Sequence, residues 1–176
     1  MKIKMLKIAR AVSLTTITLT ALLSAPIAYA QEAKSLGTFK YWTAWTNKDA
    51  NGVICYVSSQ PQDSQPTNVN RDPIHFMIIH RKGLGTKNEV QTIVGYPISE
   101  TSSPSVIVDG KTYPMLAEGS AAWLASPKDE TAFVDGMKRG SEMIVKGKSK
   151  RGTNTTDTYS LSGVTAAMAE IDKACK

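Results

Sequence analysis

The residue types that most often do chemistry are few in this sequence, and their spacing assembles no known site. Gly147-Lys148-Ser149 matches the end of a phosphate-binding P-loop, but the preceding glycine, Gly140, is too far away and Lys148 lies in a strand pattern. His75 and His80 fall in one predicted strand at an odd spacing, so they point to opposite faces and cannot jointly hold a metal from that strand. The sequence therefore predicts no metal ligand and no cofactor.

No sequence motif of a hydrolase occurs in the chain. No Gly-x-Ser-x-Gly motif occurs, which argues against one class of serine hydrolase. Convergent triads leave no motif, and the 15 carboxylates fall mainly in predicted turns and on helix faces. We therefore predict no catalytic residue and no enzyme. An envelope glycan or peptidoglycan hydrolase stays an alternative that requires a cleft with two facing carboxylates, or with His and Ser.

The candidate interaction surface is a basic stripe near the carboxyl end. Lys146, Lys148, Lys150 and Arg151 would present four positive charges on one strand face and the turn that follows it. Such a face suits anionic lipid, polysaccharide or an acidic protein partner. The alternative is a charged sheet edge that only prevents aggregation.

Three aromatic residues have two interpretations. Trp42, Tyr56 and Trp123 could stack on sugars if their rings are exposed. Packing in the core is the expected role for at least two of them.

Positions 1–30 have the order of a secretory signal peptide. An apolar run from about 11 to 23 follows the basic residues, and Ala28-Tyr29-Ala30 precedes Gln31. The run contains several threonines and is shorter than the roughly 20 apolar residues that a spanning helix needs. We predict a signal peptide over 1–30 and a mature domain over 31–176 without a transmembrane segment. The mature protein is then periplasmic, outer-membrane-associated or secreted.

Removal of the leader changes the charge balance. The whole chain carries +6, but four of its 21 basic residues and none of its 15 acidic ones lie in positions 1–30, so the mature chain carries +2. That small excess does not support nucleic-acid binding. The remaining length, about 146 residues, suits one domain with its own core.

The two cysteines are expected to form a disulfide. Cys55 and Cys175 are the only thiols, and an exported chain enters an oxidising compartment in which such a pair is normally bridged. A catalytic or metal-binding cysteine is the alternative. Because the bridge would span most of the domain, the loop-entropy argument gives it an upper value of roughly 5 kcal/mol of stability.

Most of the mature chain has the period-two alternation of β-strands. Antiparallel pairs are expected for 38–46 with 53–58, 74–81 with 89–94, and 106–108 with 111–116; further strands are expected over 141–150 and 153–161. The Asp109-Gly110 turn is the best hairpin signal. The polar segment 60–73 contains three prolines and is predicted to be irregular, a mobile or binding loop.

Two helices complete the prediction. Ser126 can cap the first, Pro127 suits its first turn and Gly140 ends it. The second carries an apolar stripe at helical spacing, formed by Val164, Ala167, Met168, Ile171 and Cys175. We therefore expect a mainly β, single-domain antiparallel β-sandwich or flattened barrel, with one internal helix, a C-terminal helix and one disulfide.

Several motifs resemble one protein family. They are Trp42-Thr-Ala-Trp45, Cys55-Tyr56, Ser59-Gln60-Pro61, Gly95-Tyr96-Pro97, Ala122-Trp123, Lys148-Ser-Lys-Arg-Gly-Thr153, Asp157-Thr-Tyr-Ser-Leu-Ser-Gly163 and the terminal Cys175. Together they resemble the invasion-associated locus B proteins of alphaproteobacteria over nearly all of the mature chain. The resemblance implies an exported, β-rich envelope or secreted protein that contributes in some pathogens to entry into host cells, notably erythrocytes. It implies no catalytic residue.

The functional expectation combines these points. We expect a non-enzymatic envelope or secreted protein whose surface meets an envelope or host-surface partner, with host-cell invasion as the role that the resemblance implies. The alternatives are the envelope hydrolase and a periplasmic small-ligand carrier, which would need an enclosed apolar pocket.

Overall fold

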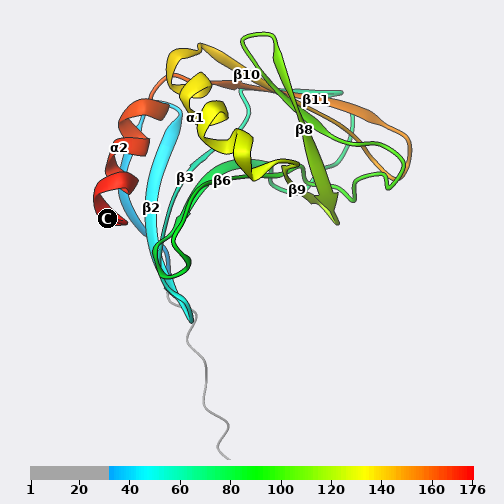
Figure 1. The fold of residues 1–176 in the computed structure, drawn as a ribbon. Helices are drawn as coiled ribbons and strands as arrows, with labels where there is room; N and C mark the ends of the chain where they lie inside the picture. Colours follow the sequence, from blue (N-terminus) through cyan, green and yellow to red (C-terminus); the bar gives the residue numbers. More distant parts are fainter. Residues whose placement is uncertain (1–31) are drawn as a thin grey trace, which may run out of the picture. The chain divides into compact units, whose positions relative to one another are not determined.

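The computed structural model describes residues 32–176, so the predicted signal peptide lies outside the described residues. The described chain is mainly β, with two α-helices and two short 3-10 helices (Figure 1). In chain order the elements are β1 (Lys34–Phe39), β2 (Trp42–Asp49), β3 (Gly52–Ser59), β4 (Asp63–Gln65), β5 (His75–Arg81), η1 (Lys82–Leu84), β6 (Thr86–Ile93), β7 (Ser105–Val108), β8 (Lys111–Glu118), β9 (Ala121–Leu124), η2 (Pro127–Asp129), α1 (Glu130–Arg139), β10 (Glu142–Lys148), β11 (Asn154–Ser160) and α2 (Val164–Ala174).

All strands join one antiparallel sheet of 11 strands, in the order β1-β2-β3-β5-β6-β9-β8-β7-β10-β11-β4. The sheet is not closed, because β1 and β4 are its two edges. The mainly antiparallel β fold with an internal helix, a C-terminal helix and one disulfide is therefore confirmed, whereas the flattened-barrel alternative is wrong.

Strand β8 divides the sheet into two halves. Its first residues, Lys111 to Pro114, pair with β7, and its last residues, Met115 to Glu118, pair with β9. Pro114 stands at the change of partner, where a residue without an N–H costs no ladder hydrogen bond. We call β1, β2, β3, β5, β6 and β9 half A, and β7, β10, β11 and β4 half B.

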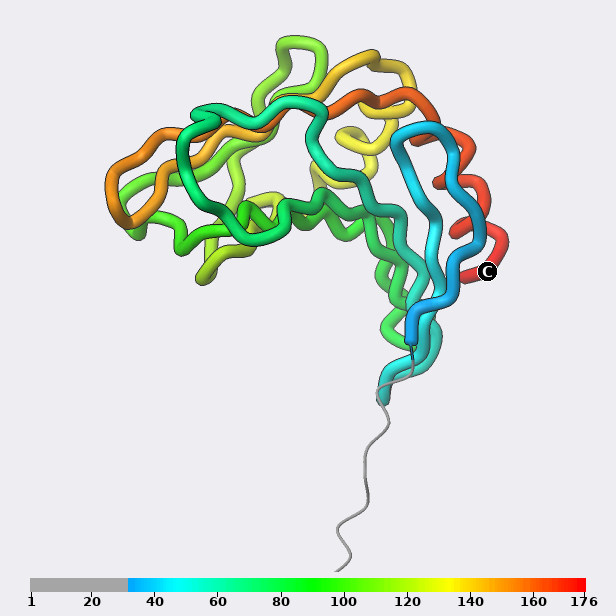
Figure 2. Tube along the Cα trace, turned by 180° about the vertical axis from the view of Figure 1, so that it is seen from behind, coloured from blue at the N-terminus to red at the C-terminus, as the bar shows by residue number. Residues whose placement is uncertain are grey.

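The core lies between the two halves and under the helices. Helix α2 covers the inner face of β1, β2 and β3, and α1 contacts both β6 and β7 (Figures 1 and 2). The ring of Phe76 on β5 packs against Trp42, Phe133 and Tyr159, so half A, α1 and half B meet at one aromatic side chain. Burial of these large rings, together with the aliphatic residues of the core, stabilises the fold.

The hairpin and both helices agree with the sequence expectations, with local exceptions. Asp109 and Gly110 have φ values of 47° and 80°, as a tight hairpin turn requires. The five-residue stripe of α2 is buried as predicted. The buried residues of α1 are Phe133, Val134 and Met137. Contrary to the expected cap, Ser126 makes no side-chain capping hydrogen bond within residues 32–176.

The predicted strand over 38–46 is wrong as one element. The chain turns at Lys40 and Tyr41, where Lys40 has a φ of 54°, and β1 and β2 form a hairpin on either side of that turn. Trp42 and Ala44 are buried, whereas Tyr41 is 47% exposed. The expected antiparallel pairing of this region with 53–58 is confirmed, because β2 pairs with β3.

The 60–73 segment contains a short strand that its polar composition does not predict. Its residues 63–65 form β4, which pairs with β11 through Asp63, Ser64 and Gln65. The rest of the segment is irregular, as predicted. The three-residue strand was missed because it is too short and too polar for period-two alternation to reveal it.

Candidate functional site

The basic stripe begins on the outer face of β10. Lys146 and Lys148 are exposed there, while Met143 and Val145 on the other face are buried, as the alternation predicted. The residues opposite Lys146 on the neighbouring strands are Ser105 and Thr156, which are uncharged. Among residues 32–176 neither lysine makes an ion pair, so both charges are available to a partner.

The other two basic residues lie in the turn after β10, in different surroundings. Lys150 Nζ is 2.7 Å from Glu100 Oε1, and this hydrogen bond lowers the pKa of the Glu100 carboxyl. The turn is attached to the 97–100 segment by two backbone hydrogen bonds, from Ser99 to Lys148 and from Lys150 to Pro97. The stripe therefore contains two unpaired strand lysines and one lysine whose charge is compensated.

Arg151, the fourth member, lines a small polar cleft. Asn70, Arg71, Tyr96 and Thr155 line the same cleft, whose volume of 20 Å³ leaves room for about one water molecule. This cleft is too small for an organic ligand. The cleft places Arg151 beside Arg71 and Tyr96.

Arg71 and Asp157 form a buried ion pair that the sequence reasoning missed. Arg71 Nη1 and Nη2 donate to the two carboxylate oxygens of Asp157 at 2.7 and 2.6 Å, and the side chains are 7% and 1% exposed. Nε and Nη2 of Arg71 also donate to the carbonyl oxygen of Val94, at 3.0 and 2.7 Å. A bidentate pair of this kind fixes orientation as well as charge. It joins the 60–73 segment to β11 and to the end of β6.

Tyr96 covers this ion pair. The Arg71 guanidinium lies 5.0 Å from the centre of the Tyr96 ring, and the Tyr96 hydroxyl is 2.5 Å from Thr155 Oγ1. Burial raises the pKa of the Tyr96 hydroxyl. A side chain at Gly147 would collide with that hydroxyl. Gly147 is thus explained by packing, which accounts for the partial P-loop match without a nucleotide.

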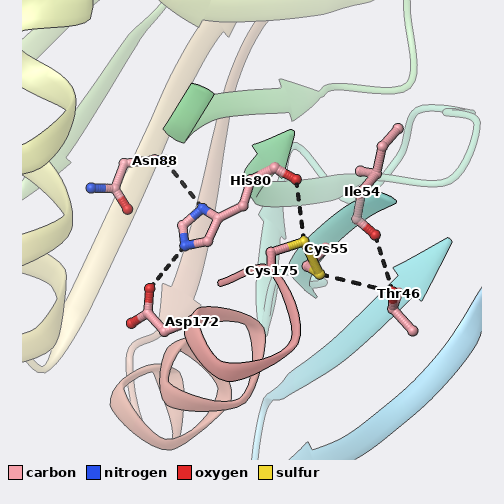
Figure 3. Close-up of a disulfide and its surroundings, with 7 residues drawn as sticks. All are labelled: Thr46, Ile54, Cys55, His80, Asn88, Asp172 and Cys175. Atoms are coloured by element: carbon pink, nitrogen blue, oxygen red, sulfur yellow. Dashed lines mark hydrogen bonds and ion pairs between the residues drawn. A yellow bond between two sulfur atoms is a disulfide. The ribbon is translucent and has the colours of Figure 1, made fainter. Parts of the chain in front are cut away.

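The disulfide forms as predicted, between Cys55 and Cys175 (Figure 3). Cys55 on β3 and Cys175 after α2 have a Cα–Cα distance of 6.0 Å. His80, which is opposite Cys55 in the β3–β5 ladder, lies 3.0 Å through Nε2 from Asp172 on α2. Its Nδ1 accepts a hydrogen bond from the Asn88 backbone N–H, so Nε2 carries the proton and donates to Asp172. His80 therefore helps to hold α2 on the sheet.

The histidines do not form a site with each other. His80 is buried on the inner face of β5, and His75 lies half-buried on the outer face. Residues 32–176 contain no group of three or more His, Cys, Asp or Glu side chains suited to a metal ion. Their placement on opposite faces is as predicted.

Two clefts contain the residue types that the hydrolase alternative requires. In the described chain neither cleft has the hydrogen bonds or surroundings of a catalytic site. His75 lines one cleft with Ser58 and Ser59, but Ser59 donates to the Tyr41 carbonyl and Ser58 accepts from Trp45, and within the described chain His75 bonds to neither serine. Asp109 and Asp135 line another cleft together with Lys111 and Arg139. Both carboxylates are exposed, and both basic residues lie in the same cleft.

Only one of the three aromatic candidates lies in the core, so the expectation of at least two is wrong. Trp42 is completely buried and donates through Nε1 to the Ser160 carbonyl. Tyr56 and Trp123 are half-buried on the outer face of half A. Tyr56 is stacked beside Trp45, with ring centres 6.3 Å apart.

Two comparisons with known proteins bear on this geometry. The model of the family described as "Invasion associated locus B (IalB) protein" matches residues 42–172. The chain belongs to the IalB family. A solved structure of invasion associated protein B from Bartonella henselae is similar in fold, with a TM-score of 0.55 and 11% identity over 80% of this chain and 97% of that one. No curated protein matches the chain.

The family match includes both sides of the buried ion pair. The Asp157–Gly163 block, which carried the resemblance, supplies Asp157 on the inner face of β11 and Gly163 before α2. Gly163 has a φ of 100°, and a side chain there would overlap the Phe39 carbonyl. Two residues of this block therefore have structural roles in this IalB-family chain. Asp157 joins β11 to Arg71, and Gly163 allows the chain to turn so that α2 packs over β1. No described helix is long and apolar enough to cross a membrane.

Proposed function

We propose that this IalB-family chain is an exported, non-enzymatic envelope or secreted protein that binds an anionic partner through the outer face of β10. The observation that carries the proposal is the pair of exposed lysines, Lys146 and Lys148, which face solvent beside uncharged neighbours and make no ion pair within the described chain. Two unpaired positive charges on one sheet face attract acidic groups, and the attraction falls as salt is added.

Three observations support an exported location and a role at a cell surface. The sequence order of positions 1–30 predicts export, the disulfide suits an oxidising compartment, and the similar protein from Bartonella henselae is named as invasion associated. We propose that the mature domain, 31–176, meets an envelope or host-cell surface, and that host-cell invasion is its role where a host is present.

The test is charge reversal on β10. Lys146→Glu with Lys148→Glu should reduce binding to bacterial envelope fractions and to host-cell membranes at least tenfold, measured by co-sedimentation at low salt. Both lysines are exposed, so the melting temperature should not fall. Lys128→Glu with Lys138→Glu changes the net charge equally at exposed positions near and on α1 and is the matched control.

The outcome separates a local site from general charge. If both double variants lose binding equally, net charge alone acts and the β10 face is not the site. If neither loses binding, the basic stripe is a protected surface with no partner. Lys150 is left unchanged in this test because a glutamate at 150 would stand beside Glu100 and disturb the turn.

A further inference from the structure

The cleft that His75 lines with Ser58 and Ser59 lies on the outer side of half A. It forms where the β1–β2 turn meets the end of β3, the 60–62 segment and the start of β5. Its volume is 350 Å³, within the roughly 300–1,000 Å³ of small-molecule sites. The residues that matter for its chemistry are Tyr41, Trp45, Gln60, Gln62 and His75.

The lining that the described residues form combines aromatic rings with polar side chains that have no hydrogen-bond partner. Tyr41 is 47% exposed, and Trp45 is half-buried beside it. Within residues 32–176 the side chains of Gln60, Gln62 and His75 make no hydrogen bond, so their donors and acceptors face the cleft or solvent unpaired. Among residues 32–176, no Asp, Glu, Lys or Arg lines this cleft.

The aromatic side of the cleft is held in place before any ligand arrives. Trp45 Nε1 donates to Ser58 Oγ at 2.9 Å, and the indole is stacked beside Tyr56 at an interplanar angle of 18°. Ser59 Oγ donates to the Tyr41 carbonyl at 2.7 Å, which fixes the turn that carries the Tyr41 ring. A site ordered in advance loses less entropy on binding.

We propose that this cleft binds a neutral oligosaccharide. A sugar ring has an apolar C–H face, which can lie on the Trp45 or Tyr41 ring, and a rim of hydroxyls, which can exchange hydrogen bonds with the glutamine amides and His75. A charged ligand would lose its hydration without finding an opposite charge in the lining. A purely apolar ligand would cover the polar groups without pairing them. The proposal does not depend on the β10 lysines, because the two surfaces share no residue.

The test is an array of neutral and acidic glycans probed with the purified, oxidised protein, followed by titration of the best neutral glycan. We expect binding to at least one neutral glycan, with a shift of the Trp45 indole N–H signal in a ¹⁵N spectrum. Gln62→Ala should weaken the affinity about tenfold, the worth of one good hydrogen bond, and Trp45→Ala should abolish binding.

The controls make each outcome decisive. Gln62 is exposed, so Gln62→Ala tests the cleft even if Trp45→Ala disturbs the fold. Trp123→Ala removes another half-buried tryptophan from the same sheet face outside the cleft and should leave affinity unchanged. Binding to no neutral glycan, binding to acidic glycans alone, or equal losses in the Trp123 and Gln62 variants would each overturn the proposal.

Discussion

Helix α2 and the 60–73 segment each return to a strand that is distant in the sequence, and the two are attached by different means. Cys175, after α2, is bonded covalently to Cys55 on β3 in half A, across 120 positions. Arg71, in the 60–73 segment, is paired with Asp157 on β11 in half B, across 86 positions. Each contact closes a long loop, but one needs an oxidant and the other needs two ionised groups.

The two halves are therefore sensitive to different changes. A disulfide acts mainly on the unfolded chain, whose conformations it restricts, and it is lost on reduction. A buried ion pair acts within the folded state, and removal of one partner leaves an uncompensated charge away from water. Half A should therefore respond to the redox state of the compartment, and half B to substitutions that change charge.

The largest expected effect comes from removing the disulfide. Cys55→Ala with Cys175→Ala should lower the free energy of unfolding by about 5 kcal/mol at most, because the closed loop covers most of the domain. Urea unfolding followed by circular dichroism measures the loss. Hydrogen exchange should show α2 amides losing protection before those of β10 and β11.

The reduced wild-type protein is the control for this variant, since it keeps both side chains. If both forms lose less than about 1 kcal/mol, the buried stripe of α2 and the His80–Asp172 contact suffice to hold the helix, and the covalent attachment is not what distinguishes half A.

The buried ion pair gives the next effect. Asp157→Asn should cost about 3–5 kcal/mol, because the Arg71 charge would then be buried without its partner. Arg71→Met with Asp157→Leu removes both charges and should recover most of that loss. The two variants, measured by urea unfolding with and without reductant, separate the charge from the packing.

The partly exposed pair Arg81–Glu89 is the matched control in half A. Its side chains are 29% and 20% exposed, so Glu89→Gln should cost about 1 kcal/mol or less. Equal losses from Asp157→Asn and Glu89→Gln would show that burial does not set the strength of the ion pair, and the comparison between the two halves would fail.

Much of the fold could be predicted from the sequence, because its signals are local. The Asp109-Gly110 hairpin and the stripe of α2 depend on neighbours within a few positions, and both are as expected. The disulfide was predictable because only one pairing of two cysteines exists. The turn at Lys40 was not, since neither Lys nor Tyr is a turn-forming residue and the alternation continues through it.

The site was less predictable because its contacts join distant segments. The basic residues were identified correctly as exposed, but the pairing of Lys150 with Glu100 depends on how the turn meets the 97–100 segment. One feature of the sequence could have indicated the ion pair of Asp157. This residue alternates with Thr155 and Tyr159 on the buried face of a strand, and a buried carboxylate requires a partner. Sequence spacing could not name Arg71 as that partner.

The smallest expected effect concerns pH and belongs to half B. Burial, and then the nearby Asp157 carboxylate, raises the pKa of the Tyr159 hydroxyl. Above a pH of about 10 the unfolded chain releases this proton while the folded chain retains it, so the free energy of unfolding falls as pH rises further. Tyr159→Phe should remove this contribution and shift alkaline unfolding to higher pH, while changing stability at pH 7 by about 1 kcal/mol or less.

Urea unfolding at pH 7, 10 and 11 measures this dependence, with Tyr41→Phe as the control because Tyr41 is 47% exposed. If Tyr159→Phe and the wild type lose stability equally between pH 10 and 11, the alkaline loss arises elsewhere. If Tyr159→Phe abolishes the pH dependence, and the wild-type dependence is the same with and without reductant, half B responds to charge and protonation independently of the disulfide. The disulfide and the buried ion pair would then differ in their response to solution conditions as well as to mutations. The stability of half A would depend on the redox state, and that of half B on pH.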